Sequence, residues 1–163
     1  MSILEAILLG VVQGLTEFLP ISSSGHLILV PWLQDYTFLQ THESFNKTFD
    51  VALHAGTLVA VISYFRQELW RMTKGVARTL RKRSVDTDDE RLGWAIVIGT
   101  VPAVIVGGLG EDWIDENLGE PWMIAILLIV FGLVLAIADR LPQRRSIESV
   151  SVKDGLLLGT AQA

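Results

Sequence analysis

The sequence has 163 residues, of which 50% are hydrophobic and 19% charged, and it contains no cysteine. Its mean hydropathy of +0.45 lies well above that of an ordinary soluble domain, so the composition favours an integral membrane protein. The absence of cysteine excludes disulfides and thiolate metal sites. The formal net charge is -5, but the distribution of the charges is more informative than their sum.

Residues 1–33 form an apolar segment that is interrupted near its middle. Between Leu19 and Gly25 the chain has a proline and three serines, and these residue types disfavour a helix interior. We therefore expect two helical arms, Ile3–Phe18 and His26–Trp32, folded as a re-entrant hairpin that opens to the outer face. Irregular backbone is tolerated at membrane depth only where it lines a protein-enclosed or watery cavity. One kinked complete span with a cytoplasmic N-terminus is the alternative.

Three long apolar stretches follow at 49–65, 92–109 and 122–138. Each is close to the lower limit of length for a helix that crosses roughly 30 Å of hydrocarbon. We therefore predict three transmembrane helices, and a buried core helix is the alternative for each stretch. Together with the hairpin they predict an all-α polytopic membrane protein, in which residues 1–163 form a single membrane domain.

The basic residues gather in particular connections. No Lys or Arg precedes Lys47, whereas segment 66–91 contains eight and segment 139–153 contains four. Segment 110–121 contains five acidic residues and no basic one. The positive-inside rule then places the two basic segments in the cytoplasm and the acidic one outside. Apolar residues interleave with the bases of 66–83, which favours a solvated interfacial helix over the alternative, a site for nucleic acid or anionic lipid, so we expect no nucleic-acid partner.

The end of the chain resembles its beginning. Residues 154–163 align without gaps on residues 5–14, with four of the ten positions identical. Because three crossings separate the two copies, the second would be inverted, which predicts the first half of an inverted-topology repeat. The second copy stops where the first continues into its polar turn. We therefore expect a truncated second repeat whose partner is the missing C-terminal half of the same protein, and a homo-oligomer is left open.

A polar cluster runs from Gln13 to His26 inside the apolar segment. Gln13 and Glu17 share one helix face beside the serine turn, and their oxygens suit a hard divalent cation, Mg²⁺ or Ca²⁺, together with phosphate oxygens. Hydroxyls and backbone N–H groups ahead of the second arm suit an anion, so we expect Ser24 and Gly25 to bind substrate. His26 suits general acid–base chemistry or the activation of a serine.

Each of these residues also has a structural interpretation. The serines could cap the second arm, Glu17 could tie two helices together, and His26 could be a satisfied core histidine. Asp50 and His54 in the first apolar stretch are further candidates. Their default interpretations are a carboxylate at the outer end of a span and a histidine hydrogen-bonded across helices.

Two motifs resemble the undecaprenyl-diphosphate phosphatases, also called bacitracin-resistance proteins. They are QGLTEFLPISSSGH at Gln13–His26 and FDVALHAGTLVAV at Phe49–Val61. The resemblance implies metal-dependent hydrolysis of a polyprenyl diphosphate lipid, undecaprenyl diphosphate, to undecaprenyl phosphate and phosphate, which recycles the lipid carrier of cell-wall synthesis. It also implies a multi-pass protein of the bacterial cytoplasmic (inner) membrane, with a site open to the periplasmic face. A lipid or solute transporter with inverted repeats is the alternative.

The resemblance also implies roles for individual residues. Gln13 and Glu17 would handle metal and phosphate, and the catalytic set would be Glu17, Ser22, Ser23 and His26. Ser23 is expected to be the nucleophile or a phosphate ligand, with His26 as its acid–base partner. The family has a second motif, P-G-x-S-R-S-G, whose arginine grips the diphosphate, and this chain ends before it. The 163-residue chain alone is therefore expected to be inactive.

Overall fold

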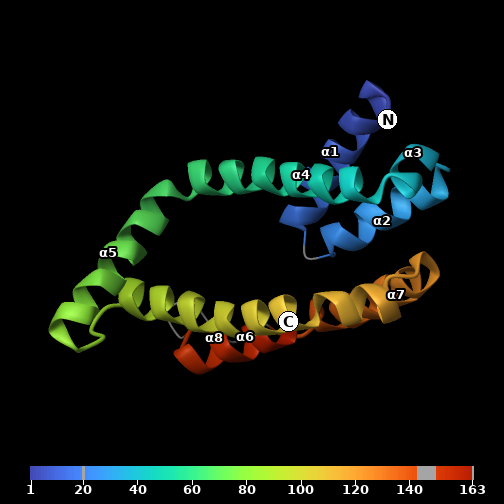
Figure 1. The fold of residues 1–163 in the computed structure, drawn as a ribbon. Coiled ribbons are helices and arrows are strands. Elements are labelled where there is room, and N and C mark those ends of the chain that lie inside the picture. The colour runs from blue at the N-terminus through green and yellow to red at the C-terminus, as the bar shows by residue number, and fades with distance from the viewer. Residues whose placement is uncertain (20, 143–149, 163) are drawn as a thin grey trace. The chain divides into compact units, whose positions relative to one another are not determined.

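The computed structural model describes residues 1–19, 21–142 and 150–162, with the side chains of residues 43, 111–116 and 162 outside the description (Figure 1). Its described part consists of helices and the segments that connect them, and it contains no strand. The helices are α1 (Ile3–Phe18), α2 (Ser23–Leu33), α3 (Thr37–Thr41), α4 (Glu43–Tyr64), α5 (Arg66–Lys82), α6 (Asp88–Leu118), α7 (Pro121–Ala138) and α8 (Val152–Gln162).

Some predicted features fall outside the described residues. These are Pro20 in the polar turn, Arg144 and Arg145 in the second basic segment, and Ala163 at the end of the predicted second repeat. The chain divides into two compact units. The first comprises Met1–Ser63 and Leu118–Pro142, and the second comprises Tyr64–Asn117 and Gln143–Ala163.

The hairpin at the start of the first unit has two helical arms. The first arm, α1, has the predicted bounds Ile3–Phe18. The second begins at Ser23, earlier than the predicted His26, because Ser22 caps it and its hydroxyl accepts the Gly25 N–H at 3.3 Å. The serines are therefore the cap and first turn of α2 and not a separate loop. That the hairpin is re-entrant stays a prediction.

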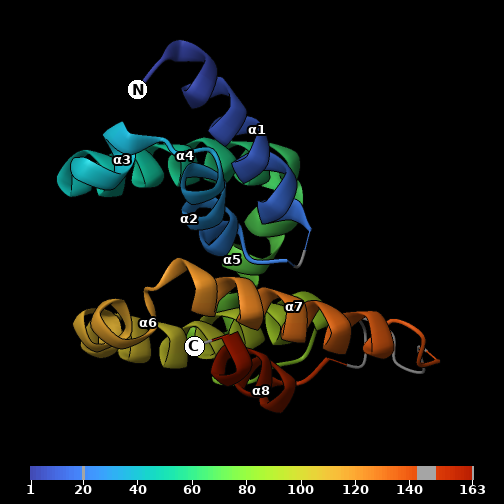
Figure 2. The ribbon, with the colours of Figure 1, turned by 90° about the vertical axis from the view of Figure 1, so that its right-hand side faces the viewer.

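Helix α2 is the centre of the first unit and contacts α1, α3 and α7 (Figure 2). Leu9, Leu27 and Leu39 are buried together in the hydrophobic core of this unit. On the side of α7, a Cβ atom at Gly25 would lie 3.1 Å from Leu128 and 3.3 Å from Ile124. Glycine at this position therefore allows a close approach of α2 and α7, which holds the polar turn in place.

Within the described part of the chain, two helices are long and apolar enough to cross a membrane. They are Asp88–Gly110 within α6 and Pro121–Ala138, with mean hydropathies of 2.0 and 2.7. They contain the second and third predicted spans. Helix α4, which contains most of the predicted span 49–65, meets the same test only together with α5 as a bent pair, so a third crossing stays a prediction.

The acidic segment 110–121, which connects the second and third apolar stretches, is helical over most of its length. Helix α6 continues to Leu118, and α7 begins at Pro121. Acidic side chains lower hydropathy without breaking a helix, whereas Gly119 and Pro121 are the residues that disfavour its continuation. The drop in hydropathy thus marks the end of the apolar stretch and not the end of the helix.

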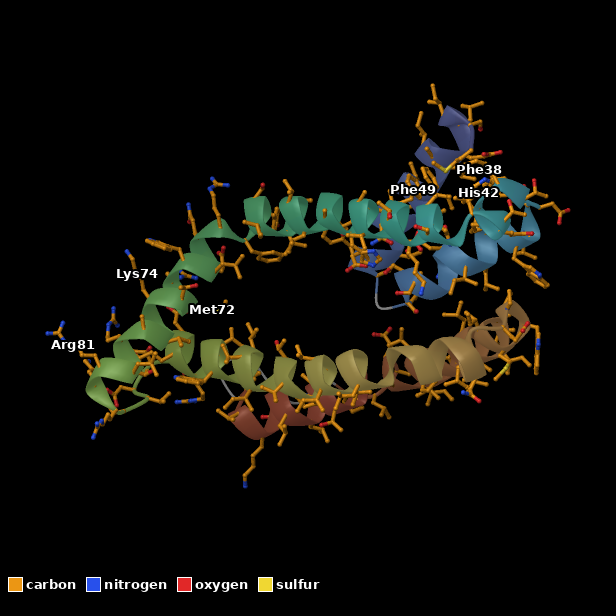
Figure 3. All side chains as sticks on the ribbon, in the orientation of Figure 1. Phe38, His42, Phe49, Met72, Lys74 and Arg81 are labelled. Carbon is orange, nitrogen blue, oxygen red and sulfur yellow. The ribbon has the colours of Figure 1, made fainter. Side chains whose placement is uncertain are left out.

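In the second unit, the basic segment forms the amphipathic helix α5. Figure 3 shows Lys74 and Arg81 on one side of α5 and Met72 on the other. The Lys74 ammonium lies 4.7 Å from the centre of the Trp70 ring, a cation–π contact. This confirms the predicted helix over the basic segment.

Hydrogen bonds and an ion pair stabilise the turn between α5 and α6. Glu90 is buried and accepts the backbone N–H groups of Asp86 at 2.8 Å and Thr87 at 3.2 Å, while Arg78 lies 3.6 Å from its other oxygen. The Trp94 indole donates to the Thr79 hydroxyl at 2.7 Å. These bonds satisfy backbone N–H groups of the turn just before α6 and join the start of α6 to α5.

Candidate functional site

Three helices of the first unit bring polar side chains to one place. Helix α1 supplies Gln13 and Glu17, which lie one turn apart on the same face. The first turn of α2 supplies Ser23, and α4 supplies His54. Gln13 is 1% exposed, whereas the Glu17 side chain is 35% exposed. The cluster is therefore buried at Gln13 and accessible to solvent at the Glu17 carboxylate.

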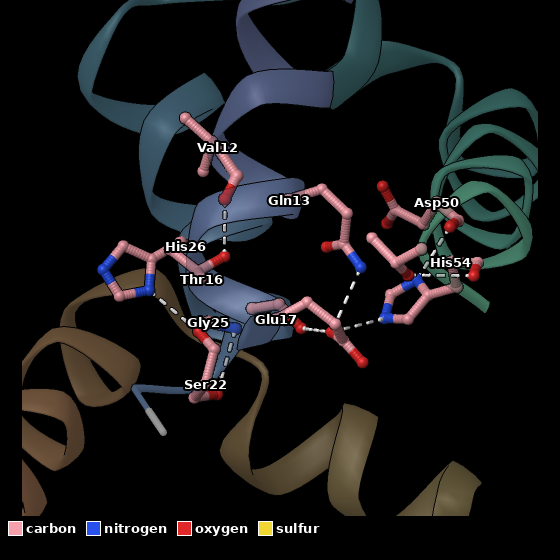
Figure 4. Close-up of polar contacts among 11 residues, drawn as sticks. Val12, Gln13, Thr16, Glu17, Ser22, Gly25, His26, Asp50 and His54 are labelled. Atoms are coloured by element: carbon pink, nitrogen blue, oxygen red, sulfur yellow. Dashed lines mark hydrogen bonds and ion pairs between the residues drawn. The ribbon is translucent and has the colours of Figure 1, made fainter. Parts of the chain in front are cut away.

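The Glu17 carboxylate is the centre of the cluster (Figure 4). Its Oε2 atom accepts a hydrogen bond from the Ser23 hydroxyl at 2.5 Å and another from Gln13 Nε2 at 3.2 Å. Such a short O–H···O distance is typical of a charge-assisted hydrogen bond to an ionised carboxylate. The hydroxyl proton of Ser23 thus already points at a group that can accept it.

His54 approaches the same carboxylate oxygen. Its Nε2 atom lies 3.9 Å from Glu17 Oε2, and its Nδ1 atom lies 2.8 Å from the carbonyl oxygen of Asp50. A carbonyl only accepts, so Nδ1 carries the hydrogen and Nε2 is the atom that faces Glu17. The motif around His54 was visible in the sequence, but no sequence signal connects this residue to Glu17.

His26 belongs to the same hairpin but points elsewhere. Its Nδ1 donates to the Ser22 carbonyl at 2.8 Å, which leaves Nε2 available. In Figure 4 the His26 and His54 rings lie on opposite sides of Glu17. Among the described residues, no hydrogen bond joins His26 to Ser23, and the structure pairs the Ser23 hydroxyl with Glu17 instead.

Ser22 sits at a strained corner of the backbone. Its φ of 63° lies in the left-handed region, which costs a residue other than glycine on the order of 1–3 kcal/mol. Its carbonyl accepts the N–H of His26 at 3.3 Å in addition to the ring bond, and its hydroxyl caps α2. Its geometry is that of a helix cap, and its predicted catalytic role stays a prediction, as do the substrate-binding roles of Ser24 and Gly25.

The residues present fit a hard divalent cation in part. Gln13 Oε1 is buried and has no hydrogen-bond partner within the described chain. A half-turn of the amide would bring this oxygen to Glu17, and two such oxygens become favourable neighbours only around a cation. The described residues contain no group of three or more His, Cys, Asp or Glu side chains that could hold a metal, so phosphate and water oxygens would complete the coordination.

The basic residues of the chain lie far from this site in sequence. None precedes Lys47, so the hairpin carries no arginine or lysine of its own. A diphosphate beside Glu17 would be repelled unless its charge is neutralised by a cation or by groups from elsewhere. The start of α2 contributes partial positive charge through its free backbone N–H groups.

Comparisons with known proteins show the family of the chain. The family model described as "Bacitracin resistance protein BacA" matches residues 6–163. The chain belongs to this family. With its apolar helices, membership makes it a multi-pass membrane protein. No solved structure matches the chain significantly.

Curated relatives extend beyond the chain. An "Undecaprenyl-diphosphatase 2" from Stutzerimonas stutzeri is 46% identical over 100% of this chain and 59% of its own length. An "Undecaprenyl-diphosphatase" from Hahella chejuensis is 40% identical with the same coverage, and one from Desulforudis audaxviator is 44% identical over 98% of the chain and 57% of its own length. The chain thus spans somewhat more than half the length of these relatives.

Proposed function

We propose that this chain is the N-terminal part of an enzyme that hydrolyses undecaprenyl diphosphate to undecaprenyl phosphate and inorganic phosphate, recycling the lipid carrier of cell-wall synthesis. The main support is the 2.5 Å hydrogen bond that the hydroxyl of Ser23, at the start of α2, donates to Glu17. It joins a nucleophile, a proton acceptor and an anion-binding helix end at one point. The relatives named undecaprenyl-diphosphatase support the same conclusion.

The contacts suggest how the chemistry would proceed. Ser23 Oγ attacks the terminal phosphorus while Glu17 accepts its proton, and the bond from that phosphorus to the bridging oxygen breaks, so that undecaprenyl phosphate leaves. His26 Nε2 is then available as a base for the water that releases phosphate from the serine. A divalent cation, Mg²⁺ or Ca²⁺, held by Glu17 and Gln13 Oε1 would neutralise charge on the diphosphate. In the alternative assignment, Ser23 holds phosphate and His26 attacks.

The same proposal covers the arrangement in the membrane. The hairpin of residues 1–33 would be re-entrant and open to the periplasmic face of the inner membrane, with transmembrane helices in the three predicted stretches. The basic and acidic segments alternate as this topology requires. Helices α1 and α8 begin with the same Ser-x-x-acid pattern, which supports an inverted repeat. The missing half would complete the site, so the chain alone would be inactive; assembly into a homo-oligomer is left open.

A phosphate-release assay with undecaprenyl diphosphate tests the function. We would compare the chain alone with a chimera that adds the remaining C-terminal part of the Stutzerimonas relative. The chimera should release phosphate and the chain alone should not. In the chimera, Ser23→Ala and Glu17→Gln should each lower the rate at least about 100-fold.

The test includes a control variant and an outcome that would favour a different function. Thr41→Ala removes a hydroxyl that bonds the Thr37 carbonyl in α3, away from the hairpin turn, and it should leave the rate unchanged. Rapid turnover by the chain alone would contradict the proposed need for a second half. Release of no phosphate by any chimera, combined with movement of lipid across vesicles, would favour a transporter.

A further inference from the structure

The separation between His54 and Glu17 is too long for a hydrogen bond. A direct N–H···O bond has its heavy atoms about 2.7–3.2 Å apart, whereas Nε2 and Oε2 are 3.9 Å apart. Two donor atoms about 2.1 Å from one metal ion lie at most about 4.2 Å from each other. The observed gap therefore admits an ion between the two side chains.

The other side of the His54 ring is arranged as in a metal site. Ligating histidines nearly always donate their second ring N–H to a carboxylate, a backbone carbonyl or water, which orients the ring. His54 does this through Nδ1, which donates to the Asp50 carbonyl at 2.8 Å. The His54 and Glu17 side chains are 41% and 35% exposed, so an ion can reach them.

A third polar group supports the same position. Gln13 is buried and its Oε1 atom has no partner among the described residues, although its amide already contacts Glu17. Leaving a buried acceptor unpaired costs about 1–3 kcal/mol. Rotation of the amide would turn Oε1 toward Glu17, where this oxygen could bind an ion held between Glu17 and His54.

We propose that His54 Nε2, together with Glu17 and Gln13 Oε1, binds a divalent cation in a mixed nitrogen and oxygen site. This rests on the proposed cation at the phosphate site and adds a nitrogen ligand from α4 to it. Imidazole strengthens binding of first-row transition ions far more than binding of Mg²⁺ or Ca²⁺, which prefer oxygen ligands. Binding of His54 should therefore raise the affinity of the site for a first-row transition ion such as Mn²⁺ more than its affinity for Mg²⁺.

The chain contains a matched control histidine. As in His54, the Nδ1 atom of His42 lies close to a backbone carbonyl, that of Phe38, at 3.0 Å, and the Thr41 hydroxyl lies 3.0 Å from the same nitrogen. Its ring stacks on Phe38 with centroids 4.2 Å apart, at the end of α3 (Figure 3). His26 provides a second comparison, because its ring lies on the other side of Glu17.

Mn²⁺ alone, added to the purified chain in detergent without substrate, provides the test. Electron spin echo spectroscopy should show ¹⁴N coupling from a directly bound imidazole. His54→Ala and His54→Gln should remove this coupling and weaken Mn²⁺ binding about 10- to 100-fold, while Mg²⁺ binding, measured by competition, changes less than about threefold. His42→Ala should retain both the coupling and the affinity.

Three results would overturn the assignment. They are unchanged Mn²⁺ affinity and ¹⁴N coupling in folded His54→Ala, loss of the coupling in His26→Ala with retention in His54→Ala, and no Mn²⁺ binding by the helical, unsubstituted chain. Circular dichroism shows whether each variant keeps its helices. Because no substrate is present, this experiment can fail while the chimera still releases phosphate, and the reverse is equally possible.

Discussion

Helices α1 and α8 begin in the same way. In α1 the Ser2 N–H donates to Glu5 at 2.7 Å and the Glu5 N–H donates to the Ser2 hydroxyl at 3.2 Å. In α8 the Ser151 N–H donates to Asp154 at 2.8 Å and the Asp154 N–H donates back to the Ser151 hydroxyl at 3.4 Å. Both are reciprocal capping boxes, and both lie at corresponding positions of the aligned segments.

The two helices differ in what they bury. Helix α1 buries Leu9, Gln13 and Thr16 within the first unit. Helix α8 runs beside α6 in the second unit, and a Cβ atom at Gly159 would run into the carbonyl oxygen of Gly99 (Figures 1 and 2). Gly10, the residue of α1 that aligns with Gly159, has only the Leu53 side chain nearby, 3.8 Å from such a Cβ. A shared pattern thus determines a shared helix start, while the neighbouring helix determines what each face does.

The largest expected difference comes from alanine at the aligned glycines. Gly159→Ala would push α8 away from the α6 backbone and should destabilise the chain by about 2 kcal/mol, even after the gain in helix propensity. Gly10→Ala should be neutral or stabilise by up to about 1 kcal/mol, because the added methyl group makes an ordinary contact. Unfolding in detergent, followed by circular dichroism, would measure both. Equal effects at the two positions would remove the contrast between the helices.

The next effect concerns the shared caps. Ser2→Ala and Ser151→Ala each remove a hydroxyl that accepts a backbone N–H, and each should cost about 1 kcal/mol. The same unfolding experiment applies, with Ser2→Thr and Ser151→Thr as controls that keep the hydroxyl. A loss at only one of the two helices would show that the caps are not equivalent.

The smallest expected effect on stability is at the polar face of α1. Gln13→Leu loses one hydrogen bond to Glu17 but also removes a buried oxygen without a partner, so the free energy of unfolding should change by less than about 1 kcal/mol. Phosphate release by the chimera should nevertheless fall at least about tenfold, because Gln13 is placed in the cation site. A large loss of stability would instead make Gln13 a structural residue, like the glycines of α8.

Much of the hairpin could be predicted from its sequence. Local signals determine where α1 begins and ends, and the spacing of Gln13 and Glu17 correctly places both on one face. The start of α2 was predicted too late, because serine is compatible with both a turn and a first helical turn. The end of α6 was predicted too early, because hydropathy was used as a marker for a helix end.

The partners of the site residues could not be predicted in the same way. Ser23 is closer in sequence to His26 than to Glu17, yet its hydroxyl donates to Glu17. The reason is the reversal of the chain between α1 and α2, which brings the start of one helix beside the end of the other. His54 joins the same carboxylate from α4, and that contact depends on the packing of helices distant in sequence.

The sequence by itself determined the membrane class, the family, the helix caps and the residue types available for phosphate chemistry, because each depends on composition or on neighbours a few positions apart. Only the tertiary structure decided that Ser23 pairs with Glu17, that His26 points away from that carboxylate and that His54 faces it. The Ser23–Glu17 contact depends on the packing of α1 against α2, whereas the approach of His54 to Glu17 brings α4 to α1.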